Sequence, residues 1–133
     1  MRIIYFALAM MVISSVNAAD VQWSKGYDAN CTDATERSDG TPLLAPEIAS
    51  VEYYIYKEGA FPAGNPEIPP IVMVGGCKLT FIDTKLLTTG NKEAYAVTID
   101  TEARRSVYSS PAFVFTVTKS NPKPPSGMIG TLR

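Results

Sequence analysis

The apolar residues between Glu93 and Val117 recur at every second position in two stretches. They are Tyr95, Val97 and Ile99, followed by Phe113, Phe115 and Val117. A period of two places alternate side chains on opposite faces of a strand, and β-branched and aromatic residues suit that half-buried surface. The pattern therefore predicts a hairpin of two strands joined by a polar loop over 101–106.

Further short apolar stretches predict four more strands. They are 21–24 (centred on Trp23), 51–57, 71–74 and 77–81 (with Cys77, Leu79 and Phe81 on one face). Glycine, proline, Asn and Asp mark turns between them, as in the long loop 25–50. No stretch predicts a helix of convincing length. We expect an all-β sandwich of about six or seven strands, with one face of the hairpin packed against Trp23, Leu79 and Phe81.

The two ends of the chain differ in composition from its centre. Met1-Arg2, the apolar run 3–13 and the small residues 16–19 are typical of a cleaved signal peptide. The alternative is a membrane anchor, but a span takes about 20 apolar residues. We assign 1–19 to the signal peptide, 20–118 to the sandwich and 119–133 to a proline-rich tail. We therefore expect a secreted or periplasmic protein without a stable membrane anchor after cleavage.

Charge narrows the class of partner. Without residues 1–19 the chain has 11 Lys and Arg against 13 Asp and Glu. A slightly acidic protein is a poor match for nucleic acid, which favours a strongly basic face, or for anionic lipid. We expect neither partner.

Two cysteines, Cys31 and Cys77, are present. In an exported protein an even number predicts a disulfide; the alternative is a pair of free thiols in a reducing compartment. The bridge would close a loop of about 46 residues and stabilise the fold by about 4 kcal/mol in the chain-entropy model.

The catalytic inventory is small. The chain has no histidine, which removes the commonest general base and metal ligand, and oxidised cysteines are not nucleophiles. The acidic residues are scattered. We expect no enzyme activity, no catalytic residues and no cofactor.

Several short motifs resemble those of a fibronectin type III domain of the variant found in small secreted bacterial and phage proteins. They are Trp23, the D-G-T-P-L turn over 39–43, the Y-Y-I-Y strand over 53–56, the Y-A-V-T strand over 95–98 and Tyr108-Ser109-Ser110. The resemblance covers roughly 21–117 and implies an immunoglobulin-like sandwich. The chain departs from the pattern at its start, because almost no residues precede Trp23 to make the usual first strand.

The loop of the last hairpin holds the densest positive charge, Arg104 and Arg105, beside Glu102. Loops at the tip of a sandwich are common binding surfaces, and Arg side chains suit carboxylate or phosphate groups. The alternative role of these charges is solubility.

Tyr54 and Tyr56 share one face of their strand. They could stack on sugar rings, or they could pack beneath the loop 59–70. The residues Asp28, Asn30, Asp33 and Asp39 could form local turns, or their side-chain oxygens could bind calcium. Position 33 is Asp where a calcium loop requires Gly, so we expect turns and no metal.

The sequence thus favours a secreted, non-catalytic binding or adhesion module that recognises a protein or glycan at a cell or virion surface. One alternative is a structural assembly subunit that pairs through an open sheet edge or its C-terminal tail. Another is an inhibitor of an envelope enzyme that uses a protruding loop.

Overall fold

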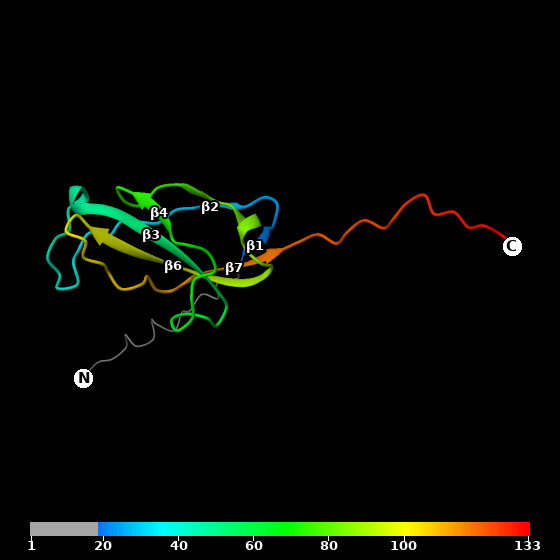
Figure 1. Ribbon diagram of the computed structural model, residues 1–133. Coiled ribbons are helices and arrows are strands. Elements are labelled where there is room, and N and C mark those ends of the chain that lie inside the picture. Colours follow the sequence, from blue (N-terminus) through cyan, green and yellow to red (C-terminus); the bar gives the residue numbers. More distant parts are fainter. Residues whose placement is uncertain (1–18) are drawn as a thin grey trace, which may run out of the picture.

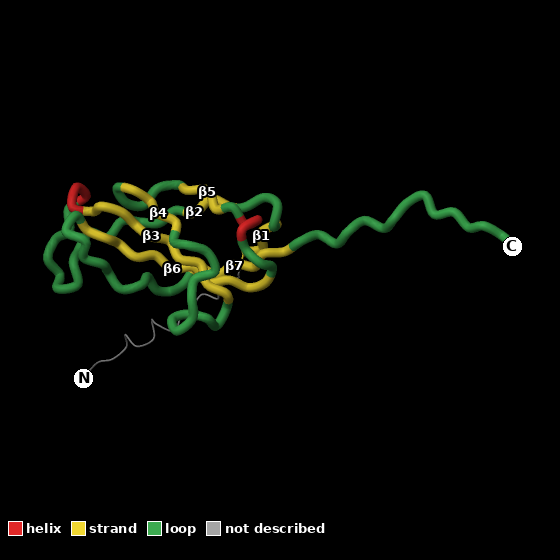
Figure 2. Tube along the Cα trace, in the orientation of Figure 1, coloured by secondary structure: helices red, strands yellow, loops and turns green. Residues whose placement is uncertain are grey.

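The computed structural model describes residues 19–133, which form strands with very little helix (Figures 1 and 2). The strands are β1 (Ala19–Gln22), β2 (Tyr27–Ala29), β3 (Ile48–Lys57), β4 (Ile71–Val74), β5 (Thr80–Ile82), β6 (Gly90–Asp100) and β7 (Phe113–Thr118). The helical turns are η1 (Ala45–Glu47) and η2 (Thr84–Leu86). The all-β prediction is confirmed. The predicted signal peptide lies outside the described residues, apart from Ala19.

Within residues 19–133 the strands form two sheets. The larger sheet has the order β1-β7-β6-β3-β4, and β2 pairs with β5 in the smaller one. The strand β1 runs parallel to β7, and the other pairs are antiparallel. The small sheet lies over the large one in Figure 2, as in a β-sandwich. No helix in this part of the chain is long and apolar enough to cross a membrane.

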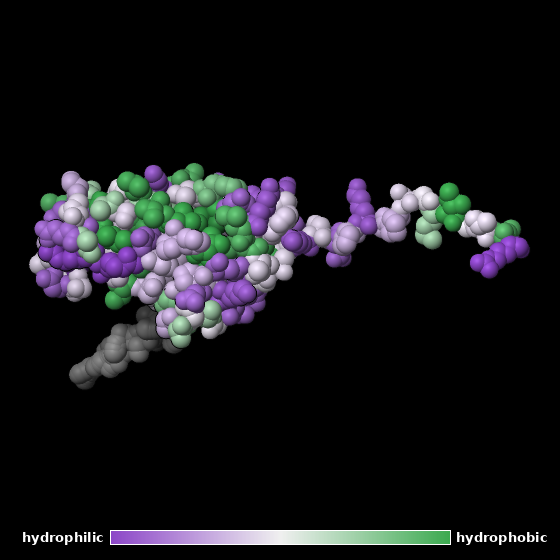
Figure 3. Space-filling model, in the orientation of Figure 1, coloured by the Kyte–Doolittle hydropathy of each residue, from purple (hydrophilic) through white to green (hydrophobic). Residues whose placement is uncertain are grey.

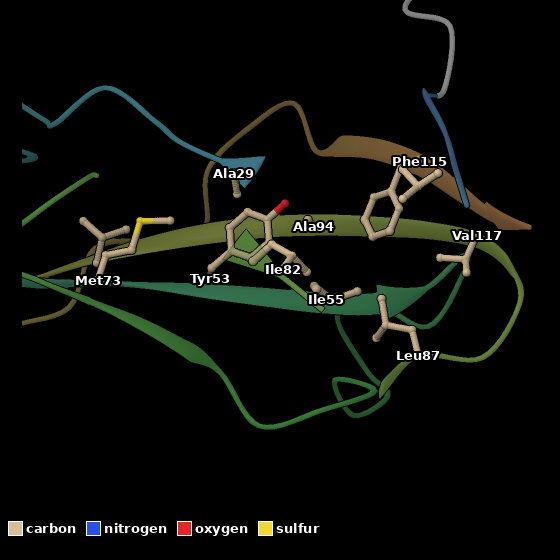
Figure 4. Close-up of a cluster of buried hydrophobic side chains, with 11 residues drawn as sticks. Ala29, Tyr53, Ile55, Met73, Ile82, Leu87, Ala94, Phe115 and Val117 are labelled. Carbon is tan, nitrogen blue, oxygen red and sulfur yellow. The ribbon is translucent and has the colours of Figure 1, made fainter. Parts of the chain in front are cut away.

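The core lies between the two sheets, and β3 contributes most to it. Val51, Tyr53 and Ile55 alternate along β3 and face the small sheet, as the period of two predicts. The core side chains that Figure 4 labels are Ala29, Tyr53, Ile55, Met73, Ile82, Leu87, Ala94, Phe115 and Val117. Burying one large apolar side chain fully stabilises a fold by about 1.5–3 kcal/mol.

One polar contact joins the sheets inside this core. The hydroxyl groups of Tyr27 on β2 and Tyr53 on β3 lie 2.7 Å apart and form a hydrogen bond. Burial raises the pKa of Tyr53 to about 12 and raises that of Tyr27 further. Each hydroxyl therefore stays neutral and satisfies the other, which a buried tyrosine requires.

The outer face of the large sheet carries a second group of aromatic side chains. We call it the outer aromatic cluster: Tyr54, Tyr56, Phe61, Tyr95 and Tyr108. The ring of Phe61 stacks on Tyr95 at 3.8 Å and meets Tyr56 edge to face at 5.2 Å. The loop 59–70 thus covers this face. The small side chains of Ala94 and Ala96 point the other way, toward the core.

Two sequence-based expectations about the core are wrong. The strand after Cys77 begins only at Thr80, and its buried residue is Ile82, while Leu79 and Phe81 are 68% and 60% exposed. The register that pairs Ile82 with Tyr27 turns Ile82 inward and Phe81 outward.

The other concerns the position of Trp23, which follows β1 rather than lying at its centre, although its side chain packs against the core as expected. Val21 is the buried residue of β1, and the half-buried Trp23 ring packs beneath the Lys119 ammonium, 4.2 Å from the ring centre.

The loop 59–70 is tied to the sheet by a buried ion pair. The Lys92 ammonium on β6 lies 2.5 Å from the Glu67 carboxylate, and both side chains are buried. Glu67 also accepts hydrogen bonds from the backbone N–H and hydroxyl of Thr88. Burial alone raises the pKa of Glu67, but Lys92 and Thr88 outweigh it and hold that pKa below its ordinary value.

We predict that Glu67→Gln lowers the free energy of unfolding by about 3–5 kcal/mol, because it leaves the Lys92 ammonium buried without a counter-charge. Urea unfolding followed by circular dichroism measures this loss. The matched control is the double variant Glu67→Gln/Lys92→Met, which removes both charges and recovers most of the stability. Equal stability of Glu67→Gln and the wild type would show that the pair does not hold the loop.

Candidate functional site

A groove opens at the end of the sandwich where the β2–β3 loop (30–47) and the β6–β7 loop (101–112) meet. Its volume is about 820 Å³. One wall is formed by residues 34–39, the other by 104–107, and Leu43, Thr98 and Asp100 lie between them. Leu43 is buried, whereas Val107 at the rim is 87% exposed. The groove thus has the apolar side chain of Leu43 beside polar groups at its floor and the exposed apolar side chain of Val107 at its rim.

The first wall is a short hairpin built on the D-G-T-P motif. The Arg37 N–H donates to Thr41 O, and the Leu43 N–H donates to Thr35 O. At the turn the Asp39 carboxylate accepts from the backbone N–H and the hydroxyl of Thr41, and Gly40 adopts the left-handed φ of 87°. These bonds lower the pKa of Asp39. The motif therefore forms a tight turn, for which Asp and Gly are suited.

The second wall depends on Asp100, the buried last residue of β6. Its Oδ1 atom accepts from the backbone N–H groups of Glu102 and Arg104 at 2.9 and 2.8 Å. Its Oδ2 atom accepts from the guanidinium groups of Arg37 and Arg104 at 2.8 and 3.1 Å. The Arg37 guanidinium, followed by these N–H groups, holds the pKa of Asp100 well below its ordinary value. One carboxylate therefore fixes the turn over 101–104 and ties both walls together.

Arg37 carries this connection across the groove. Besides Asp100, its guanidinium lies 3.6 Å from the Glu47 carboxylate, and Glu47 accepts from the N–H of Leu44 at the start of η1. The backbone adds a direct link, because the Thr101 N–H donates to Glu47 O. The two loops thus hold each other in place before any partner binds.

The turn that Asp100 holds contains a strained residue. Ala103 has a φ of 67°, a left-handed conformation that costs a residue other than glycine about 1–2 kcal/mol. Such strain persists where surrounding contacts determine the backbone, and it is enriched at functional sites. Here the N–H groups on both sides of Ala103 are bound to Asp100.

The predicted binding residues fall into two groups. Arg104 forms ion pairs with both Asp100 and Glu102. Arg105 lies 3.0 Å from the Glu52 carboxylate and donates to the Tyr54 hydroxyl at 2.6 Å. Both arginines therefore shape the groove wall through internal pairs.

Tyr54 and Tyr56 do not line the groove. Tyr54 meets Tyr108 edge to face, and Tyr56 is almost fully buried beneath Phe61. The structure therefore places Arg104 and Arg105 in the groove wall, pairs Glu102 with Arg104 outside the lining, and places the two tyrosines in the outer aromatic cluster.

The first wall is anchored to the rest of the molecule by the disulfide. Cys31 and Cys77 are bonded, as the sequence predicts, with 5.2 Å between their Cα atoms. Beside the bridge the Asp33 carboxylate accepts from the Cys77 N–H at 2.7 Å. A Cβ added at Gly76 would lie only 2.8 Å from both Asp33 carboxylate oxygens, so a larger residue there would crowd this carboxylate. Asn30 and Asp39 thus bind neighbouring backbone N–H groups, as expected for local turns, whereas Asp33 binds the distant Cys77 N–H.

Sequence reasoning missed Asp100 and Arg37, the centre of the site. An Asp at the start of a turn is a common signal, but the partner lies 63 residues away in the chain. No local pattern links the two, so the pair is visible only in the folded molecule.

Comparisons with protein-family models, curated proteins and solved structures found no match to this chain. The assignment of a function therefore rests on the geometry of the molecule.

The Asp100 carboxylate makes stability depend on pH. Because its pKa is lower in the folded state, its contribution is present above the ordinary Asp pKa of about 3.9 and is lost as the pH falls below that value. We predict that Asp100→Asn melts at a lower temperature than the wild type at pH 7 and that the difference narrows toward about pH 2. Thermal unfolding across this range measures it.

The matched control is Asp28→Asn, which changes an exposed carboxyl group on β2. We expect it to follow the wild type at each pH. A difference between Asp100→Asn and the wild type that stays constant across the range would contradict the assigned role of the Asp100 charge.

Proposed function

We propose that this chain is an exported, non-catalytic recognition module with an immunoglobulin-like, fibronectin type III-like fold, and that it binds a protein segment in the groove. The observation that carries the proposal is the groove itself, which has Leu43 at its floor, Val107 at its rim and walls tied together by Asp100. Different observations support the proposed fold, the proposed compartment and the proposed class of partner.

The strand order supports the fold. In immunoglobulin-like sandwiches the third, sixth and seventh strands share a sheet, and the second and fifth strands pair in the other. The order β7-β6-β3-β4 opposite β2-β5 has this arrangement. The groove then lies where variable domains carry their binding loops, between the second and third and the sixth and seventh strands.

The disulfide supports export, because such bonds persist in oxidising compartments. The N-terminal sequence of 1–19 favours the same compartment. Among the candidate catalytic groups at the groove, the Asp39 and Asp100 carboxylates already bind backbone N–H groups or arginine, and the sequence has no histidine to act beside them. We therefore propose binding rather than catalysis.

The groove's chemistry favours a protein segment over a glycan. Sugar rings commonly stack on aromatic faces, but none of the described residues that line the groove is aromatic. Tyr108, which follows the rim residue Val107 in the chain, packs edge to face on Tyr54 instead. The lining charges are balanced between arginines and carboxylates. An apolar side chain of a partner would contact Leu43 and Val107, and flanking polar groups would meet the paired charges.

The internal ion pairs also lower the cost of binding. Loops that are ordered before binding lose less conformational entropy when a partner arrives. The double anchoring of the 34–43 hairpin, through the disulfide and through Arg37, provides this order.

The test is site-specific photocrosslinking. A benzoylphenylalanine residue at Val107 is activated in the presence of the surface and secreted proteins of the producing cells, and adducts are identified by mass spectrometry. We expect one predominant protein adduct. We also expect that Arg37→Ala, which releases one wall, weakens capture of that protein at least about tenfold, or 1.4 kcal/mol.

The control places the same photoreactive residue at Leu86, which is similarly exposed on η2 but lies outside the groove lining. That position should give no enriched adduct. Equal adducts at both positions, or binding on a glycan array without any protein adduct, would contradict the proposal.

A further inference from the structure

The small sheet has an open edge beside an unfilled pocket. Among residues 19–133, β2 pairs only with β5, because β1 joins β7 in the other sheet. The first strand of a sandwich commonly covers this edge, and here that position is free in the described chain. An uncovered edge presents backbone N–H and C=O groups to which another strand can add.

The pocket beside this edge is apolar at its base. It has a volume of about 200 Å³ and lies among Tyr27, Asp28, Ala29, Asn30, Tyr53 and Phe113. Phe113 remains 44% exposed even though its ring stacks near Phe115 and Tyr27. The volume is below that of typical small-molecule sites, and it suits one large apolar side chain of a strand laid along β2.

The C-terminal tail, residues 119–133, offers such side chains. Met128, Ile129 and Leu132 are 87%, 88% and 97% exposed. Figure 1 shows the tail leaving the end of β7 and extending away from the body, and Figure 3 shows apolar and polar side chains along it. Three exposed apolar side chains on an extended segment indicate a docking segment rather than a spacer.

The path of the tail directs it to another molecule. Lys119 packs on Trp23 and sets the direction in which the tail leaves. The prolines at 122, 124 and 125 favour an extended chain of about 3.1 Å per residue. The nine residues 119–127 therefore carry Met128 about 28 Å from the end of β7. Return to the same molecule's pocket would require a reversal within this proline-rich stretch.

Charge complementarity favours a second copy of this chain as the acceptor. Residues 20–118 contain 13 Asp and Glu against eight Lys and Arg, whereas the tail contains Lys119, Lys123 and Arg133 and no acidic side chain. The free edge itself presents the exposed Asp28 carboxylate. A basic tail and an acidic body attract each other between copies.

We propose that the tail of one copy adds as a strand to the free edge of β2 in a second copy and places Met128 or Ile129 in the pocket beside Tyr27 and Phe113. The contact joins two different surfaces, so each copy can both donate a tail and accept one. Such contacts link copies into chains, or into a closed pair when two copies exchange tails. This assembly uses a surface separate from the groove.

Sedimentation equilibrium of the full secreted chain tests the proposal. We expect the average mass to rise with protein concentration and the association to weaken as salt screens the charges. Two variants should reduce self-association at least about tenfold: Met128→Ser/Ile129→Ser, which removes the anchors, and Asn30→Trp, which fills the pocket. Asp28→Lys provides a second acceptor variant, which reverses the charge of one lining residue and leaves Asn30 in place.

Mixing the variants gives the sharpest result. The tail variant retains a pocket and the pocket variant retains a tail, so the mixture should form a one-to-one pair although neither associates alone. Val107→Asp, in the groove, should associate like the wild type.

Three results would overturn the proposal: a wild type that stays monomeric, a mixture that stays monomeric while the wild type associates, or loss of association in Val107→Asp. The last would place the tail in the groove.

Discussion

The buried carboxylate of Asp100 is the interaction on which the candidate site depends. It ends β6, accepts the N–H groups of the following turn and receives the guanidinium of Arg37 from the opposite loop. A buried charge is costly unless it is paired and hydrogen-bonded. Here its four bonds meet that requirement and fix two loops, one that joins the small sheet to the large sheet and one that joins two strands of the large sheet. The strained conformation of Ala103 follows from this arrangement.

The rest of the fold holds the partners of Asp100 in position. The long antiparallel pairing of β3 with β6 brings Glu47 and Asp100 to the same end of the large sheet. The Cys31–Cys77 bridge holds the start of the opposite loop against the β4–β5 connection. The site is therefore built on a rigid sheet and a cross-link, while the loops between them carry its chemistry.

Two parts of the small sheet, its loop to β3 and its free edge at β2, have different proposed roles. Its loop to β3 forms the groove wall, and its free β2 edge forms the proposed acceptor for a tail. In Figure 1 the C-terminal tail leaves the molecule at the end that lies opposite the groove. A copy could thus bind a partner at the groove while its edge and tail join neighbouring copies.

Local patterns predicted those parts of the fold that local physics determines. The alternation of Val51, Tyr53 and Ile55 and the short strand Ile71–Val74 are found as expected. The disulfide followed from the number of cysteines.

The failures concern long-range register. Leu79 and Phe81 match a buried strand as well as Ile82 does, and only pairing with Tyr27 decides which side chain turns inward. In the same way, nothing near Asp100 in the sequence indicates that Arg37 is its partner.

Amide hydrogen exchange in an Arg37→Met variant tests the central claim most directly. If Asp100 and Arg37 hold both walls, exchange should accelerate at residues 101–106 and also at 35–43, while amides of the β3–β6 pairing stay protected as in the wild type. Acceleration confined to residues near Arg37, with 101–106 unchanged, would show that the two walls are independent and would contradict the account.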